Sequence, residues 1–84
     1  MEIKVLGTGC PNCKRLEKVA REAVAEMGVE ATFTKVTDMG DIMSYDILTT
    51  PGLVIDEKVV SSGRVPSKAE VTSMIATALS GAEA

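Results

Sequence analysis

The chain has 84 residues, 45% of them apolar, and a net charge of −3 at neutral pH. A chain of this length holds one hydrophobic core, so we expect a single domain over residues 1–84. The acidic balance and the lack of a basic cluster argue against nucleic acid as a partner. The N-terminus lacks the cationic start and apolar run of a signal peptide, and no segment reaches the roughly 18–20 apolar residues of a membrane span. We therefore expect a cytoplasmic monomer that does not bind membranes.

The first predicted elements are a strand and a long helix. Glu2 to Leu6 is short, contains β-branched residues and is closed by Gly7-Thr8-Gly9, which is typical of a buried strand. Pro11 stands where proline favours the first position of a helix, and Gly28 is a natural helix stop. Between them, apolar residues recur every three or four positions and form one face of an amphipathic helix. That face consists of Leu16, Val19, Ala20, Ala23, Val24 and Met27.

The middle of the chain predicts a second strand, a short helix and a hairpin. Apolar and polar residues alternate from Val29 to Thr34, which is the period of a strand. Asp38 can cap a short helix that runs to about Tyr45. Two apolar runs, Leu53–Ile55 and Lys58–Ser62, then flank a tight Asp56-Glu57 turn, and together they predict a β-hairpin.

The last predicted element is a helix that begins at a capping box, Ser67 to Glu70, and ends at Gly81. Its inward residues are expected to be Val71, Met74, Ile75, Ala78 and Leu79. Most of the methionines, Met27, Met39, Met43 and Met74, fall on helical faces and are interpreted as core filler. The order strand, helix, strand, helix, hairpin, helix predicts an α/β fold. Its sheet is a mixed four-stranded one with flanking helices, and its first two strands are parallel.

The two cysteines carry the clearest chemistry of the sequence. In a reducing compartment, a cysteine pair favours redox or metal chemistry over a static structural disulfide. Cys10 lies at the start of the first helix, where unpaired N–H groups and the helix dipole favour a thiolate. Cys13 lies three residues later on the same edge, within disulfide reach and more buried. This arrangement suits thiol–disulfide exchange in which Cys10 is the nucleophile and Cys13 the resolving thiol.

Metal binding is the main alternative for the same cysteines. A structural zinc site needs four ligands, and this chain has two cysteines and no histidine, so we expect no metal site and no cofactor. A two-coordinate copper(I) carrier remains an alternative, because soft thiolates select that ion. Such a carrier would resemble the heavy-metal-associated family. That family has methionine where this sequence has Thr8, and it ends on a strand rather than on a helix.

Two landmarks of the chain resemble the thioredoxin superfamily. The first is the segment from Gly7 to Cys13 between a predicted strand and helix, and the second is Thr50-Pro51 just before another strand. With the final helix, they resemble most closely the small archaeal and bacterial thioredoxin/glutaredoxin-like redox-active disulfide proteins. The resemblance implies a thioredoxin-like fold over nearly the whole chain and a redox-active pair at Cys10 and Cys13.

The resemblance also implies how substrates and electrons reach the pair. Pro51 matches a proline that is cis and faces the cysteines, and Thr50 would offer its backbone to an extended substrate peptide. Pro11 and Asn12, between the cysteines, would complete the substrate-binding residues. The implied partners are protein disulfide substrates and an electron donor of the thioredoxin-reductase type.

The sequence departs from its closest resemblances in two ways. Thioredoxins proper bury an aspartate where Lys4 stands here, so the sequence identifies no proton acceptor for Cys13. Glutaredoxins carry an aromatic residue where Asn12 stands, and an acidic Gly-Gly-x-Asp-Asp segment where this chain reads Ser62 to Ser67. Glutathione-dependent glutaredoxin activity is therefore a further alternative. Arg64 in that segment is interpreted as a solvated loop charge.

Overall fold

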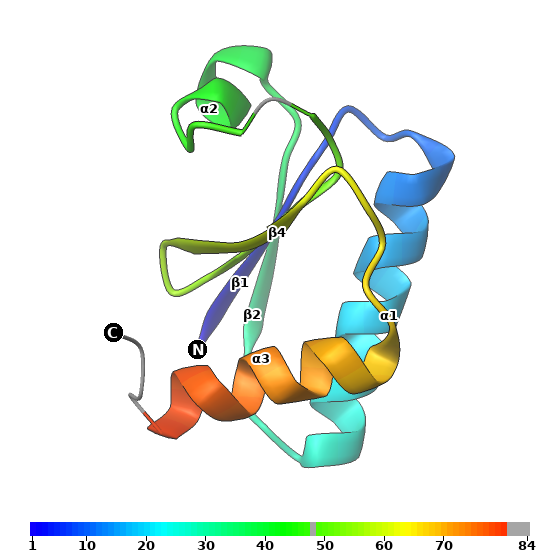
Figure 1. Ribbon diagram of the computed structural model, residues 1–84, viewed down its shortest axis with the longest axis vertical. Helices are drawn as coiled ribbons and strands as arrows, with labels where there is room; N and C mark the ends of the chain where they lie inside the picture. Colours follow the sequence, from blue (N-terminus) through cyan, green and yellow to red (C-terminus); the bar gives the residue numbers. More distant parts are fainter. Residues whose placement is uncertain (48, 81–84) are drawn as a thin grey trace.

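The fold is an α/β arrangement around one sheet. The computed structural model describes residues 1–47 and 49–80. Its elements in chain order are β1 (Glu2–Leu6), α1 (Pro11–Met27), β2 (Thr32–Val36), α2 (Met39–Met43), β3 (Gly52–Ile55), β4 (Lys58–Ser62) and α3 (Lys68–Ser80). Figure 1 shows α1 and α2 on opposite sides of the strands, with α3 crossing beside α1. The predicted four-stranded sheet with helices on both faces is confirmed.

The strand order is β2-β1-β3-β4, which makes β1 a central strand. β1 pairs with β2 in parallel and with β3 antiparallel, so the sheet is mixed as predicted. Leu6, the last residue of β1, lies opposite Val36 on one side and opposite Gly52 on the other. The loop that follows β1 therefore lies beside the segment that leads into β3. This pairing brings the two landmarks of the sequence to the same end of the sheet.

Two apolar clusters hold the helices against the sheet. On one face, α1 and α3 pack against alternate residues of β1 and β3 because successive side chains of a strand point to opposite faces. This larger cluster contains Ile3, Val5, Leu16, Ala20, Ala23, Val24, Leu53, Ile55, Val71 and Ile75. On the other face, a smaller cluster of Leu6, Ile42, Ile47 and Val54 holds α2. Each fully buried aliphatic side chain contributes about 1.5–3 kcal/mol relative to an exposed one, so the larger cluster anchors α1 firmly.

The predicted helix stop at Gly28 and the predicted caps at Asp38 and Ser67 are confirmed. Gly28 closes α1 in the left-handed conformation, at φ 68°, which costs glycine little. The Asp38 side chain accepts a hydrogen bond from the N–H of Asp41 and caps α2. At α3, the Ser67 hydroxyl accepts from the N–H of Glu70 at 3.2 Å, while a Glu70 carboxylate oxygen accepts from the N–H of Ser67 at 3.1 Å. This reciprocal pair is the predicted capping box. The predicted stop at Gly81 lies outside the described residues.

Two predicted boundaries are shifted. The second strand begins at Thr32 rather than at Val29, because the N–H of Val29 still bonds to the carbonyl of Val24 and completes the end of α1. The ladder begins only where the N–H of Thr32 donates to the carbonyl of Met1. The short helix ends at Met43 rather than near Tyr45, and the following residues continue as turns.

Three residues predicted to be inward are exposed. Met39 and Met43 are 55% and 63% exposed, because α2 is only five residues long and buries Ile42 alone. Leu79 is 55% exposed in the last turn of α3, at the margin of the core, where Ala78 still packs against the larger cluster. Met27 and Met74 do pack against this cluster, as expected. Within residues 1–47 and 49–80, no helix is long and apolar enough to cross a membrane.

Candidate active site

The backbone after β1 places Cys10 at the N-terminus of α1. Gly9 turns the chain with a φ of 93°, a backbone conformation that residues other than glycine rarely adopt. Cys10 follows in an extended conformation as the N-cap residue, and Pro11 occupies the first turn of the helix, as predicted. The strand, glycine turn and helix start thus follow one another directly and place the cysteines at the end of β1.

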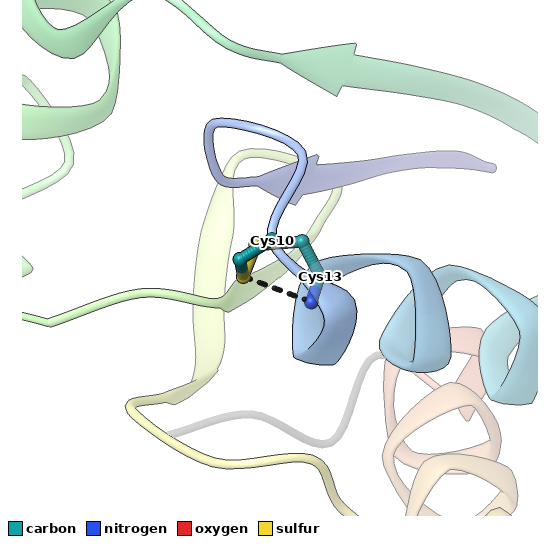
Figure 2. Close-up of a disulfide and its surroundings, with 2 residues drawn as sticks. All are labelled: Cys10 and Cys13. Atoms are coloured by element: carbon teal, nitrogen blue, oxygen red, sulfur yellow. Dashed lines mark hydrogen bonds between the residues drawn. A yellow bond between two sulfur atoms is a disulfide. The ribbon is translucent and has the colours of Figure 1, made fainter.

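A disulfide bond links Cys10 and Cys13, whose Cα atoms are 5.0 Å apart (Figure 2). The Sγ atom of Cys10 also accepts a hydrogen bond from the N–H of Cys13 at 3.1 Å. Cys13 is only 5% exposed, whereas Cys10 is half-buried. The spacing therefore places both sulfurs within disulfide reach, with Cys13 beneath Cys10. A sulfur that accepts a helix N–H is favoured in its anionic form, as at other helix N-termini.

Gly7 allows the chain to pass close to the buried sulfur. A Cβ atom at this position would collide with Sγ of Cys13 and would lie 3.1 Å from Cβ of the same residue. The N–H of Gly7 donates to the carbonyl of Val36 at 2.9 Å and so extends the β1–β2 pairing by one residue. Glycine is required here for close approach, since this segment lies directly against Cys13.

Thr50 and Pro51 lie at the same end of the sheet. Their peptide bond is cis, as the resemblance implied. Pro51 is buried, its carbonyl accepts from the N–H of Gly63 at 2.9 Å, and the next residue, Gly52, pairs with Leu6 of β1. Thr50 is exposed. The predicted substrate-binding residues therefore include a buried proline and an exposed residue beside the loop that carries the cysteines.

Cys13 borders a small cavity between α1 and β2. The cavity has a volume of about 60 Å³ and is lined by Val5, Gly7, Gly9, Cys13, Lys14, Glu17, Lys35 and Thr37. Glu17 lies one helical turn after Cys13, and Lys35 comes from the edge strand. Neither residue was singled out from the sequence as part of the site. The four-residue spacing between Cys13 and Glu17 was the available signal, whereas the approach of Lys35 depends on the β1–β2 pairing.

Glu17 is an ionised residue in this cavity wall. Its carboxylate accepts from Nε of Arg21, four residues later on α1, at 2.9 Å and lies 3.2 Å from Nζ of Lys35. Partial burial alone would raise the pKa of Glu17, but the hydrogen bonds from Arg21 and Lys35 outweigh it and hold the pKa below its ordinary value. Arg21 also stacks over the ring of Phe33, with its guanidinium carbon 4.5 Å from the ring centroid.

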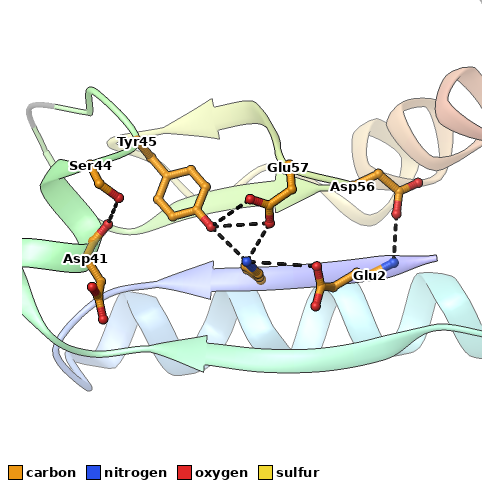
Figure 3. A network of polar contacts seen from close by, with 7 residues as sticks. Glu2, Asp41, Ser44, Tyr45, Asp56 and Glu57 are labelled. Atoms are coloured by element: carbon orange, nitrogen blue, oxygen red, sulfur yellow. Dashed lines mark hydrogen bonds and ion pairs between the residues drawn. The ribbon is translucent and has the colours of Figure 1, made fainter.

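Lys4 belongs to a different polar group, which it forms with Tyr45 and Glu57; Figure 3 shows these two partners facing each other. Its Nζ donates to the hydroxyl of Tyr45 at 2.8 Å and to the carboxylate of Glu57 at 2.5 Å. The hydrogen bonds to Glu57 and then to Tyr45 raise the pKa of Lys4 well above its ordinary value, so it stays charged. Because Val5 lines the cysteine cavity, its neighbour Lys4 points to the opposite face. Lys4 therefore does not take the place of a buried aspartate at Cys13.

Arg64 is held in an ion pair. Its guanidinium lies 2.6 Å from a carboxylate oxygen of Glu70 in the first turn of α3. Arg64 is exposed, in agreement with its interpretation as a solvated charge, and it has in addition a specific acidic partner. The pairing forms because the capping box directs Glu70 back toward the preceding loop.

The heavy-metal-associated alternative differs from this chain in its fold. The heavy-metal-associated domain would end on a strand, whereas the described part of this chain ends on α3. Within residues 1–47 and 49–80, no group of three or more His, Cys, Asp or Glu side chains is placed to hold a metal ion.

Comparison with solved structures confirms the predicted thioredoxin-like fold. Thioredoxin 1 from Thermosipho africanus superposes with a TM-score of 0.60 at 19% identity, covering 95% of this chain and 96% of that one. The germline-specific thioredoxin Deadhead from Drosophila melanogaster gives a TM-score of 0.59 at 15% identity, covering 90% of this chain and 78% of that one.

Sequence comparison identifies the family. A family model described as a thioredoxin domain matches residues 1–76. A thioredoxin of Methanothermobacter thermautotrophicus is 44% identical over 75 residues, which cover 89% of this chain and 97% of that protein. A thioredoxin of Methanocaldococcus jannaschii is 35% identical over 79 residues, covering 94% of this chain and 91% of that protein. With its cysteine pair at the start of α1, the chain belongs to the thioredoxin family of thiol–disulfide oxidoreductases.

Proposed function

We propose that this chain reduces disulfide bonds of other proteins, with Cys10 as the nucleophile and Cys13 as the resolving thiol. The observation that carries the proposal is the position of the two sulfurs. Cys10 is half-buried at the helix start and its Sγ accepts a hydrogen bond from the N–H of Cys13, which is itself buried. Cys10 thiolate attacks a substrate sulfur and releases the other as a thiolate. Cys13 then attacks Cys10, so the substrate leaves fully reduced and the pair is oxidised.

A polypeptide substrate fits the surface beside Thr50. The exposed side chains of Met39 and Met43 border a groove of about 280 Å³, which Thr49 and Thr50 also line. Methionine is flexible and polarisable, so it adapts to apolar side chains of different shapes. An extended substrate segment along Thr50 would place a neighbouring apolar side chain in this groove. Exposed Pro11 and Asn12 would contact the substrate on the other side of its disulfide.

The proposed electron donor is a thioredoxin-reductase-type enzyme in the cytoplasm. Such a donor needs only a reachable disulfide and a compatible surface around it. Glutathione needs more contacts, because ordering a flexible tripeptide has an entropic cost. Asn12 supplies no aromatic contact, and the guanidinium of Arg64 is already paired with Glu70. These features favour the dithiol route over the glutathione route.

Selective alkylation tests the assignment of the nucleophile. We expect iodoacetamide at mildly acidic pH to modify Cys10 of the reduced protein before Cys13, because the thiolate is the reactive form and Cys10 is the more exposed. Peptide mapping after a short exposure measures the ratio. The Cys10→Ser variant serves as control and should label slowly at its remaining Cys13. Faster modification of Cys13 than of Cys10 would reverse the two roles.

A comparison of electron donors tests the proposed function. We expect insulin reduction to be driven efficiently by NADPH with thioredoxin reductase, and poorly by NADPH with glutathione and glutathione reductase. The rates are compared at equal concentrations of NADPH and of this protein, with the Cys10→Ser variant as the blank. Efficient turnover with glutathione alone would show a glutaredoxin in function and would contradict the proposed donor.

A further inference from the structure

The resolving step leaves one chemical requirement open, namely where the proton of Cys13 goes. Cys13 must lose its thiol proton to attack Cys10, yet it is 5% exposed and Lys4 points to the other face of the sheet. We propose that Glu17 accepts this proton through water in the cavity that it shares with Cys13. The proposal rests on the proposed function, because it assigns a residue to the resolving step of that reaction.

The geometry brings the two groups to one cavity. Glu17 follows Cys13 by four residues on α1, so both side chains lie on the same face of the helix, one turn apart. Both line the cavity of about 60 Å³, whose volume exceeds the roughly 10–15 Å³ that one water molecule requires. The side chain of Glu17 is 17% exposed, so it connects the cavity with solvent. A water between the two groups would find polar partners in Glu17, Lys35 and Thr37.

Cationic side chains border the cavity on both sides of the proposed transfer. Lys14 and Lys35 line it, and Arg21 holds the carboxylate of Glu17 from the next turn of α1. Because Arg21 and Lys35 lower the pKa of Glu17, its carboxylate is ionised throughout the neutral range and has a free lone pair for a proton, which it would hold only transiently. When the proton moves, the negative charge moves from Glu17 to Cys13. A thiolate on Cys13 and a carboxylate on Glu17 are therefore never present together. The two lysines face a single negative charge both before and after the step.

The resolving step moves one proton and exchanges one disulfide bond for another. The S–H bond of Cys13 breaks, and its proton passes through water to a carboxylate oxygen of Glu17. A new bond forms between Sγ of Cys13 and Sγ of Cys10, while the bond from Cys10 to the substrate sulfur breaks. The electron pair leaves with the substrate thiolate, which takes up a proton from solvent. Glu17 returns its proton to solvent at the open side of the cavity.

Rapid mixing with dithiobis(nitrobenzoate), a coloured aromatic disulfide, separates the two chemical steps. Attack by Cys10 releases the first aromatic thiolate at a rate that depends on reagent concentration. Resolution by Cys13 releases the second aromatic thiolate at a rate that is independent of reagent concentration.

In Glu17→Gln we expect an unchanged first phase and a second phase slowed about 10- to 100-fold, which is at or below the low end of the rate effects of general bases. The matched control is Glu22→Gln, since Glu22 is exposed on the same helix and does not line the cavity. Equal second phases in the wild type and Glu17→Gln would overturn the proposal.

The pH profile provides a readout that a structural role would not change. With Glu17 ionised, the second phase should be nearly flat from about pH 6 to pH 8. In Glu17→Gln it should rise about tenfold per pH unit, because only the pre-formed thiolate then reacts. A flat profile in Glu17→Gln would contradict the relay, even if the variant were slow.

Titration of Cys13 by thiolate absorbance in a Cys10→Ala background gives an independent test of proximity. In that background, Glu17→Gln should lower the pKa of Cys13, since it removes a neighbouring negative charge. An unchanged pKa would place Glu17 too far from Cys13 and overturn the relay. A missing first phase in the mixing experiment would instead overturn the proposed function, and the titration would still report on the Cys13–Glu17 pair.

Discussion

The Cys13→Ser variant will lose at least about 100-fold in disulfide reduction, because a resolving thiol on the same helix acts at a far higher effective concentration than a free thiol. Cys10 keeps its place at the helix start and still captures substrate, so the variant should accumulate as a covalent complex. Insulin reduction measures the loss. Non-reducing electrophoresis with insulin shows the trapped complex, which a reducing agent releases.

The matched control is Cys10→Ser, in which the proposed nucleophile is removed and Cys13 remains buried. This variant should lose activity to the same extent but trap no substrate. The pair of variants therefore separates capture from resolution. Covalent complexes formed by Cys10→Ser and absent from Cys13→Ser would exchange the roles of the two cysteines.

The Gly7→Ala variant will lose about 1–3 kcal/mol of unfolding free energy, the usual cost of forcing an extra group into a packed site. The new Cβ would collide with Sγ of Cys13 and also crowd Cβ of the same residue. Because Gly7 also continues the β1–β2 ladder through its N–H, the backbone cannot move away freely. Chemical denaturation of the reduced protein measures the change.

A double-mutant cycle tests whether the sulfur of Cys13 is the cause. In a Cys13→Ala background, Gly7→Ala should cost less than half as much, since the atom with which it collides is absent. Gly40→Ala is a matched glycine control in α2, where a new Cβ meets Asp38 Oδ1 at 3.1 Å and no sulfur. Equal costs of Gly7→Ala in the two backgrounds would show that the strain lies elsewhere.

Local signals were sufficient to predict most of the fold. The apolar face of the first helix, the glycine stop at Gly28 and the capping box at Ser67 depend only on neighbouring residues, and each is confirmed. The cis peptide before Pro51 was predicted from the family resemblance rather than from the residues alone. Its confirmation shows how much a recognised motif adds at a position where local propensity favours trans.

Features that depend on distant contacts were predicted less well. Met39 and Met43 have helical spacing, but spacing cannot show that α2 is too short to bury more than Ile42. The start of the second strand depended on the end of α1, where the N–H of Val29 still donates to the carbonyl of Val24. Lys35 joined the site only through strand pairing. Glu17 carried a readable four-residue spacing from Cys13, yet its meaning emerged from the cavity between them.

The position of Cys10 as the N-cap of α1 couples helix stability to redox state. The sulfur that accepts the helix N–H is the same atom that we propose as the nucleophile. A thiolate is a stronger acceptor than a neutral sulfur, so reduction strengthens the cap and each oxidation weakens it. Helix formation and oxidation of the cysteine pair are linked in one thermodynamic cycle. Any free energy by which the thiolate stabilises the helix therefore also stabilises the reduced pair, and the pair donates electrons less readily. A change anywhere along α1 that stabilises the helix only when it is capped by the anion would make this protein a weaker reductant.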